Sequence, residues 1–508
     1  MAARGKGIYV KNAAILTGTG LLLRGAGMLL RVYLAGHLGA EGMGLYQLIF
    51  TVYGLAVTAA TAGLTAVTAR VCAGMAGAGQ GQGAAPAAGR LALWGGALGL
   101  AAALGLAVLA GPAARLWVGD ARAAAPLRLL APSLPFMAMS AVLRGYFLAR
   151  RDVRPGSWAQ LLEQAVRMAL TAVLLARAQG VQEACLAAVA GSAVSEAVSW
   201  ALMALWFCSG RQSGTQGPPP RHLARRAASL WAPIAAGQYL QGGLRAAENV
   251  LVPACLTLYI GSRSGALAQY GALKGMALPL LFFPFSFLGA LSTLLLPDIT
   301  EAHARGDAAA LRHLVNRVLA LTFALGVLMG GLFALLGAPT ARVLYGADDG
   351  APVGFYLSVL GPLMPLMYAE SMVDGILKGL DQQLATFRYA VADSLIRIGL
   401  IALLAPRLGM KGFLFVMLVS NLLTSLLNLR RLLAVTGLPV RWGSWAFKPV
   451  LCFAAAASAW RLTVGPAAAA ALADLGYTLA AGAFVSAVYL LLLALCGAWA
   501  GRHRAGPL

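Results

Sequence analysis

The chain has 508 residues, of which 60% are hydrophobic and only 11% are charged. Soluble domains carry about 25% charged residues, so this composition excludes a water-soluble protein and predicts an all-α polytopic membrane protein. The formal net charge of +22 would suit a nucleic-acid binder, but the basic residues mostly separate apolar runs and do not gather on one soluble face. We therefore expect membrane lipids, and no nucleic acid, as partners.

Apolar runs of about 20 residues recur along the chain and predict about fourteen spanning helices. The segment from Asn12 to about Gly36 is too long and too charged for a cleaved signal peptide, so it is predicted to be the first span. The next five candidate spans cover 44–69, 90–111, 125–149, 157–177 and 184–208. A polar, proline-rich segment, 209–226, follows and is the best candidate linker. The remaining candidates cover 228–260, 269–297, 314–338, 354–377, 384–405, 411–429, 447–464 and 475–498.

An internal repeat predicts how these spans are grouped. Residues 130–167 align without a gap with residues 360–397, and in this register Pro132, Pro135, Glu163 and Arg167 fall on Pro362, Pro365, Asp393 and Arg397. Duplications of this kind usually place the substrate site of a membrane transporter between the repeats. We expect two six-helix bundles, a cytoplasmic linker and two extra C-terminal helices, with bounds 1–208, 209–226, 227–432 and 433–508.

The basic residues between the spans predict the orientation of the chain. With the N-terminus inside, the inner segments hold about 21 basic residues and the outer segments about 8. Both termini are therefore expected in the cytoplasm, with the protein in the plasma membrane.

Ionisable residues inside the predicted spans are the candidate functional residues, because a charge at mid-membrane costs several kcal/mol unless it meets water or a partner. Arg24 and Arg31 are seven residues apart on the first span, which puts them on one face. Polar stripes also follow the seventh span, with Gln238, Gln241, Arg245 and Glu248, and the tenth, with Glu370, Asp374 and Lys378. In the repeat register Ser140 lies opposite Glu370, and Arg144 opposite Asp374.

A purely structural explanation stays open for some of these charges. Arg245 with Glu248, and the two repeat-matched acid and arginine pairs, can each form an ion pair within one helix. Arg31 could reach the membrane interface by snorkelling, whereas Arg24 is better explained by a cavity. The six cysteines include no close pairs, so we expect neither a disulfide framework nor a metal site, and no cofactor.

Several runs resemble a known superfamily. LLRGAGMLLRVYLAGHLGAEGMGLYQLIFTVYGL at 22–55, with TAGLTAVTARV at 61–71, resembles the opening of the multidrug/oligosaccharidyl-lipid/polysaccharide exporter superfamily. AQYGALKGMALPLLFFPFSFLGALSTLLLPDITEAHARGD at 268–307 is similar to its polysaccharide-transporter branch, which includes the stage V sporulation protein B family. With DGILKGLDQQ at 374–383 and GMKGFLFVMLVSNLLTSLLNLRRL at 409–432, the resemblance extends over nearly the whole chain.

The resemblance implies two six-helix bundles around a central cavity and the flipping or export of a lipid-linked saccharide. In the more distantly similar MurJ family of lipid II flippases, cationic cavity residues engage the diphosphate of the substrate. By that analogy Arg24 and Arg31 correspond to the first-helix arginines, although their separation is one residue longer here. Lys274 falls where that family has an arginine near the eighth helix. The second span lacks a basic residue from Leu45 to Ala69, so one expected cation is missing.

The leading hypothesis is a flippase for an undecaprenyl-type lipid-linked saccharide, with a peptidoglycan precursor as one candidate and cell-wall or capsule glycosyltransferases as candidate partners. The predicted substrate-binding residues are Arg24, Arg31, Arg245, Glu248 and Lys274, and the predicted coupling or cavity residues are Arg144, Glu370 and Asp374. An ion-coupled drug exporter of the same fold stays open, because Asp374 or Glu248 could titrate or bind a cation. An enzyme is not expected, since the connections are at most about 18 residues long and hold no DxD pair or metal-spaced histidines.

Overall fold

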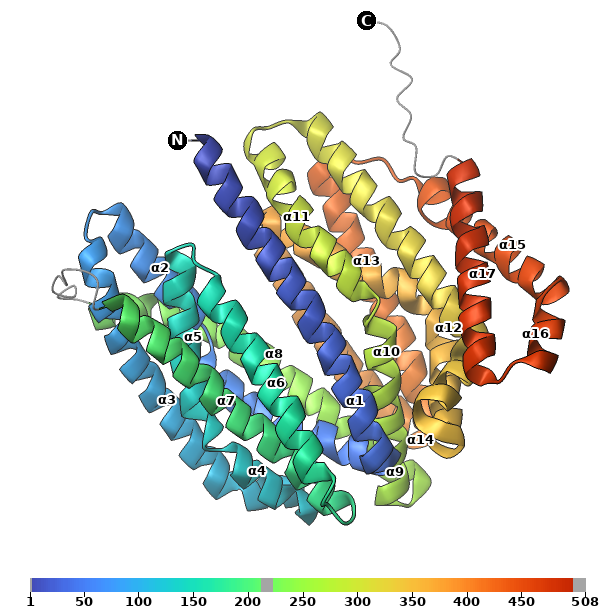
Figure 1. The fold of residues 1–508 in the computed structure, drawn as a ribbon, viewed down its shortest axis with the longest axis horizontal. Coiled ribbons are helices and arrows are strands. Elements are labelled where there is room, and N and C mark those ends of the chain that lie inside the picture. Colours follow the sequence, from blue (N-terminus) through green and yellow to red (C-terminus); the bar gives the residue numbers. More distant parts are fainter. Residues whose placement is uncertain (1, 212–222, 497–508) are drawn as a thin grey trace, which may run out of the picture. The chain divides into compact units, whose positions relative to one another are not determined.

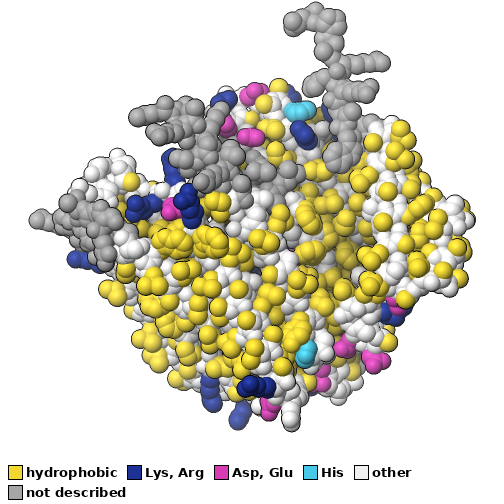
Figure 2. Space-filling view, viewed as in Figure 1, with side chains coloured by type: hydrophobic (Ala, Val, Ile, Leu, Met, Phe, Trp, Pro, Cys, Tyr) yellow, Lys and Arg dark blue, Asp and Glu magenta, His cyan; other side chains and the backbone are white. Residues whose placement is uncertain are grey.

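The computed structural model describes residues 2–211 and 223–496, and the described residues contain helices and turns but no strand. The predicted all-α class is therefore confirmed. On each compact unit, hydrophobic side chains cover much of the visible surface, as expected of a membrane protein (Figure 2). Most of the predicted linker, 209–226, lies outside the described residues.

Helix packing divides the chain into two compact units, residues 1–271 and 272–508. Figure 1 shows their helices in sequence colours. The first unit contains α1 (Ala2–Thr61), α2 (Leu64–Gly77), α3 (Ala84–Pro112), α4 (Ala124–Leu130), α5 (Ser133–Ala149), α6 (Arg154–Leu175), α7 (Val181–Arg211), α8 (Leu223–Ile260) and α9 (Arg263–Tyr270). Its shorter helical turns are η1 (Gly81–Gly83), η2 (Ala113–Val118) and η3 (Ala121–Ala123).

The second unit begins within η4 (Gly271–Ala277), a π-helical turn that joins it to α9. Its α-helices are α10 (Leu278–Phe282), α11 (Phe285–Ala304), α12 (Ala308–Leu360), α13 (Met364–Gly379), α14 (Gln383–Thr436), α15 (Lys448–Leu462), α16 (Gly465–Ala471) and α17 (Asp474–Leu495). Two further short turns are η5 (Gly361–Leu363) and η6 (Gly443–Phe447). In the core of this unit, the Tyr489 hydroxyl on α17 donates to the Ala324 carbonyl on α12 at 2.8 Å.

Six helical stretches of the described chain are long and apolar enough to cross a membrane, or eight if two bent helix pairs are each counted as one span. Three of the stretches contain a glycine with positive φ at a sharp kink: Gly39, Gly346 and Gly409. Each kinked stretch therefore holds more than one helix. The predicted ranges 157–177, 228–260 and 269–297 are also largely helical but carry more polar residues or more breaks. The protein is a multi-pass membrane protein, and the count of about fourteen spans stays a prediction.

The predicted repeat has the same local structure in both copies. Arg151 (φ 58°) and Asp381 (φ 59°) are the described non-glycine residues with positive φ, and they are matched positions of the repeat. Around them, the Asp152 amide donates to the Phe147 carbonyl at 3.1 Å, and the Gln382 amide donates to the Leu377 carbonyl at 2.9 Å. Both turns therefore end a helix with a left-handed residue and a bond that spans five residues, as in a Schellman motif.

Helices α8 and α9 pack within the first unit, although the repeat assigns them to the second bundle. The contact with α1 is very close: a Cβ on Gly44 would collide with the Leu267 carbonyl oxygen, and one on Gly271 with the Ala40 carbonyl oxygen. Glycine is thus required where these backbones meet. The boundary between the units follows from which helices pack together, whereas the predicted repeat follows from similarity of sequence. The two criteria therefore need not agree, and the predicted bundle bounds stay a prediction.

Candidate functional site

A polar cavity of about 660 Å³ lies within the first unit. It opens among α1, α2, α5, α6, α7 and α8, and its polar walls are formed by Thr61, Thr65, Arg144, Gln160, Glu163, Gln164, Glu196 and Gln238. Burying so many polar side chains in a membrane protein is costly unless they face water, each other or a ligand. This cavity is therefore the candidate functional site of the unit.

Three charged residues of the cavity wall, Arg144, Glu163 and Glu196, form a charge network with Arg167. Arg167 on α6 binds Glu163 one turn away, with Nη2 2.5 Å from Oε1, and its Nη2 is 3.6 Å from Oε1 of Glu196 on α7. Arg144 on α5 approaches Oε2 of Glu163 more loosely, at 3.6 Å. The Nε atom of Arg144 is buried and makes no hydrogen bond to any described residue. Arg144 can therefore bind an anionic group without breaking a short hydrogen bond.

The second unit contains the matching acid and arginine pair. Asp393 on α14 is buried, forms an ion pair with Arg397 and accepts a hydrogen bond from the Ser420 hydroxyl at 2.6 Å. The structural explanation of the two repeat-matched pairs is thus confirmed: both pairs form within one helix. Each pair also faces a serine on the helix that follows it, since the Arg167 Nε donates to Ser195 at 3.4 Å.

The predicted coupling residues of the second unit have different partners. Glu370 on α13 accepts a hydrogen bond from the Asn421 amide at 3.3 Å, and the Oδ1 atom of Asn421 is buried with no hydrogen-bond partner among the described residues. Asp374, one turn further along, forms an ion pair with Lys378 at 2.6 Å. Lys378 neutralises Asp374, so Glu370 is the better candidate for a group that titrates or binds a cation.

The predicted substrate-binding residues lie outside the walls of the polar cavity, although Leu23, the neighbour of Arg24, forms part of them. Arg24 and Arg31 are exposed on α1. Arg245 is exposed on α8 and donates to Gln241 at 3.4 Å, while Glu248 on the same helix is buried.

Lys274 belongs to the π-helical turn η4 and is half-buried. Its ammonium group lies 5.9 Å from the centre of the Phe413 ring, a cation–π geometry. The role of these five residues in substrate binding stays a prediction.

Sequence reasoning missed Glu196, Gln160 and Asn421. Glu196 had a usable signal, because it is an acidic residue inside the predicted span 184–208, where an ionisable group is a functional candidate by default. Gln160 and Asn421 are uncharged and had no comparable signal. Only the packing of their helices places them beside the charged residues.

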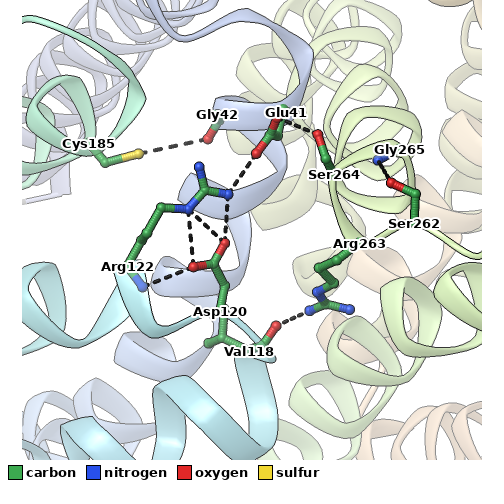
Figure 3. Close-up of polar contacts among 10 residues, drawn as sticks. All are labelled: Glu41, Gly42, Val118, Asp120, Arg122, Cys185, Ser262, Arg263, Ser264 and Gly265. Carbon is green, nitrogen blue, oxygen red and sulfur yellow. Dashed lines mark hydrogen bonds and ion pairs between the residues drawn. The ribbon is translucent and has the colours of Figure 1, made fainter.

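A second polar cluster joins three distant parts of the first unit (Figure 3). Arg122, in η3, forms ion pairs with Asp120 at 2.7 Å and with Glu41 at 2.6 Å. The Ser264 hydroxyl on α9 donates to the other oxygen of Glu41 at 2.5 Å, and the Arg263 guanidinium donates to the Val118 carbonyl. We call these residues the Arg122 cluster, and they fasten α9 to the kink of α1 and to the segment that follows α3.

Replacing Arg122 by alanine should lower the free energy of unfolding by about 1–2 kcal/mol, because two carboxylates lose a partly exposed ion pair. Burial raises the pKa of Asp120, but hydrogen bonds from the side chain and backbone of Arg122, with the charges of Arg122 and Arg263, hold it below its ordinary value. A carboxylate whose pKa is lowered in the folded state stabilises the fold at pH values above its ordinary pKa of about 3.9. This stabilisation is lost as the pH falls below that value.

The stability difference between wild type and Arg122→Ala should therefore shrink below about pH 4. Thermal unfolding of the detergent-solubilised protein across this pH range measures it. Arg115→Ala is the control, since Arg115 is an exposed residue of the same segment with no ion pair to a described residue. A difference that is constant with pH would contradict the assignment to Asp120.

Comparisons with known proteins agree with this architecture. Residues 9–229 match the family described as "Polysaccharide biosynthesis protein". The chain is 26% identical to "Stage V sporulation protein B" of Bacillus subtilis (strain 168), over 96% of this chain and 95% of that protein. The structure is similar to that of "Lipid II flippase MurJ, inward closed conformation", with a TM-score of 0.73, 14% identity and coverage of 95% of this chain and 99% of the other.

A "multidrug resistance MATE family transporter of the MOP superfamily" in an inward-facing conformation is also similar, with a TM-score of 0.65, 15% identity and coverage of 84% of this chain and 100% of the other. At these identities the two structural matches show the fold alone. The resemblance inferred from the sequence is confirmed by the family match and by the full-length curated relative.

Proposed function

We propose that this chain, which has the fold and the sequence signature of the multidrug/oligosaccharidyl-lipid/polysaccharide exporter superfamily, flips a lipid-linked saccharide across the plasma membrane. The observation that carries the proposal is the similarity to stage V sporulation protein B over nearly the full length of both chains. A match to the polysaccharide biosynthesis family across most of the first unit supports the same substrate class. An undecaprenyl-type carrier with a cell-wall saccharide is the substrate we favour.

The chemistry of such a substrate explains the charges. A lipid-linked saccharide has an anionic diphosphate and a polar head that need a hydrated path, while its apolar tail can remain in lipid. Guanidinium groups suit phosphate because their forked donors match its oxygens. Arg24 and Arg31 on α1, Arg245 on α8 and the loosely held Arg144 are the proposed diphosphate-binding residues of the first unit. Lys274 is the proposed cationic residue of the second unit.

The substrate must also be released. Glu163 lies beside Arg144 and Arg167, and the buried Glu248 lies one turn from Arg245. The negative charge of these carboxylates would offset part of the positive charge of the arginines and so weaken their attraction for the diphosphate. Transport would then proceed by alternating access, with both termini in the cytoplasm. Cysteine labelling within the linker 209–226 tests this orientation, and modification by an impermeant reagent from outside the cell would overturn it.

An ion-coupled drug exporter is the second candidate. It is favoured by Glu370, an acidic residue of α13 whose carboxylate accepts a hydrogen bond from the Asn421 amide and could take up a proton. The similarity to a multidrug transporter is evidence for the fold only.

A reconstituted flipping assay distinguishes the two candidates. The full chain in proteoliposomes should move a fluorescent undecaprenyl-diphosphate saccharide between leaflets, measured as the fraction that an external quencher reaches with time. Protein-free liposomes give the background. Transport of a cationic dye driven by an ion gradient, with no movement of the lipid-linked saccharide, would refute the flippase and support the exporter.

A further inference from the structure

We propose that a groove between α3 and α8 binds an anionic phospholipid in the leaflet on the side of the linker. The groove has a volume of about 370 Å³ and lies entirely within the first unit. Arg90, Leu91 and Trp94 form its α3 wall, and Leu223 with three alanines forms its α8 wall. Arg90 is its one charged lining residue within the described chain, so the groove offers a single cation above an apolar floor.

The depth of the groove fits the boundary between head groups and acyl chains. Arg90 and Trp94 lie one helical turn apart, near the start of the apolar stretch Gly81–Val118, which is long enough to cross a membrane. Tryptophan concentrates at membrane interfaces, and arginine at the adjoining head groups. A lipid phosphate beside Arg90 would therefore place its acyl chain along Leu91, Trp94 and the alanines of α8.

The aromatic part of the groove is held in place. The ring of Trp94 meets that of Trp231 on α8 edge to face, with centroids 5.5 Å apart. The indole nitrogen of Trp231 donates to the Ala62 carbonyl at 2.8 Å. These contacts fix α3 and α8 at the groove before any lipid arrives, so binding requires little ordering of the protein.

The charge of the residues around the groove favours an anionic lipid. The sequence has no Asp or Glu between Glu41 and Asp120, nor between Glu196 and Glu248. The charged residues of α2, α3 and the first half of α8 are therefore all basic: Arg70, Arg90, Arg225 and Arg226. Arg226 reaches towards α2, because a Cβ on Gly74 would lie 3.0 Å from its Nη2.

Arg90 forms no ion pair or side-chain hydrogen bond with a described residue, and the sequence from 209 to 226 contains no acid. A basic residue near an anionic bilayer surface contributes about 1 kcal/mol to lipid attraction. A phosphatidylglycerol-type lipid satisfies both the charge and the apolar floor, whereas a zwitterionic lipid supplies no net charge.

Native mass spectrometry of the full-length protein tests the proposal. The protein is incubated in detergent with phosphatidylglycerol or with phosphatidylcholine of identical acyl chains, and the retained lipid is counted. We expect preferential retention of phosphatidylglycerol, weakened about fivefold by Arg90→Gln and largely kept by Arg90→Lys. Arg115→Gln, an exposed arginine near the opposite end of the same apolar stretch, is the matched control and should bind as wild type.

A second variant tests the groove without changing charge. Ala228 is an exposed residue of the α8 wall, so Ala228→Phe should fill the groove and lower phosphatidylglycerol retention while leaving thermal unfolding unchanged. Equal retention of the two lipids, or wild-type retention by Arg90→Gln, would overturn the proposal. So would an equal loss in Arg115→Gln, which would show an effect of net charge, or displacement of the lipid by an acidic peptide.

Discussion

Replacing Arg24 or Lys274 by alanine is expected to reduce flipping of a lipid-linked saccharide by about 100-fold. In the proposed flippase each of these residues makes one charge-assisted contact to a phosphate, and such contacts contribute about 1.5–3 kcal/mol. Arg24 is exposed and bonds to no described residue through its side chain, so its loss should leave the fold intact. The reconstituted flipping assay, at matched protein levels in the membrane, measures the effect.

Conservative variants separate charge from shape at Arg24. Arg24→Lys keeps the charge but not the forked donors, and should retain part of the activity. Arg115→Ala removes an exposed arginine elsewhere on the first unit and should leave flipping unchanged. Full transport by both Arg24→Ala and Lys274→Ala would refute the cationic site and would favour the drug exporter.

Replacing Arg167 by methionine is expected to destabilise the first unit by about 3–5 kcal/mol. Glu163 and Glu196 would lose their shared guanidinium, and both carboxylates are largely buried, with 14% and 11% of their side-chain surface exposed. Arg144, at 3.6 Å from Glu163, is too distant to replace the short bond. Thermal unfolding in detergent, followed through intrinsic tryptophan fluorescence, measures the loss.

A double replacement tests the mechanism of this loss. Adding Glu163→Gln to Arg167→Met removes one of the two carboxylates that lost Arg167 and should recover part of the stability, because an unpaired buried charge costs more than the pair contributes. Arg397→Met is the matched variant in the second unit and should behave alike, since Asp393 is also buried. An Arg167→Met protein that unfolds at the wild-type temperature would contradict the proposed role of the network.

Local patterns in the sequence predicted the helices and the ion pairs that form within single helices. Glu163 with Arg167 and Asp393 with Arg397 followed from their spacing of four, because residues at that spacing are neighbours on any helix. The relation between the two copies followed from an ungapped register. These features depend on residues that are close in sequence, so no knowledge of tertiary packing was needed.

Contacts between distant segments could not be predicted in the same way. Glu41 and Arg122 meet because α1 bends at Gly39, and no pattern in the sequence indicates the angle of that bend. The assignment of α9 to the first unit depends on the close backbone contact at Gly44, which is one of 61 glycines in the chain. Such contacts are properties of packing and not of any single segment.

The turns at Arg151 and Asp381 have the same backbone conformation at matched positions of the predicted repeat. Both residues are held with φ near 60°, which is unfavourable for a side chain with a Cβ and especially unusual for arginine. One copy carries a cation and the other an anion, yet the backbone conformation is the same. At this position the predicted repeat therefore keeps the shape of the backbone, while the charge of the side chain differs between the two copies.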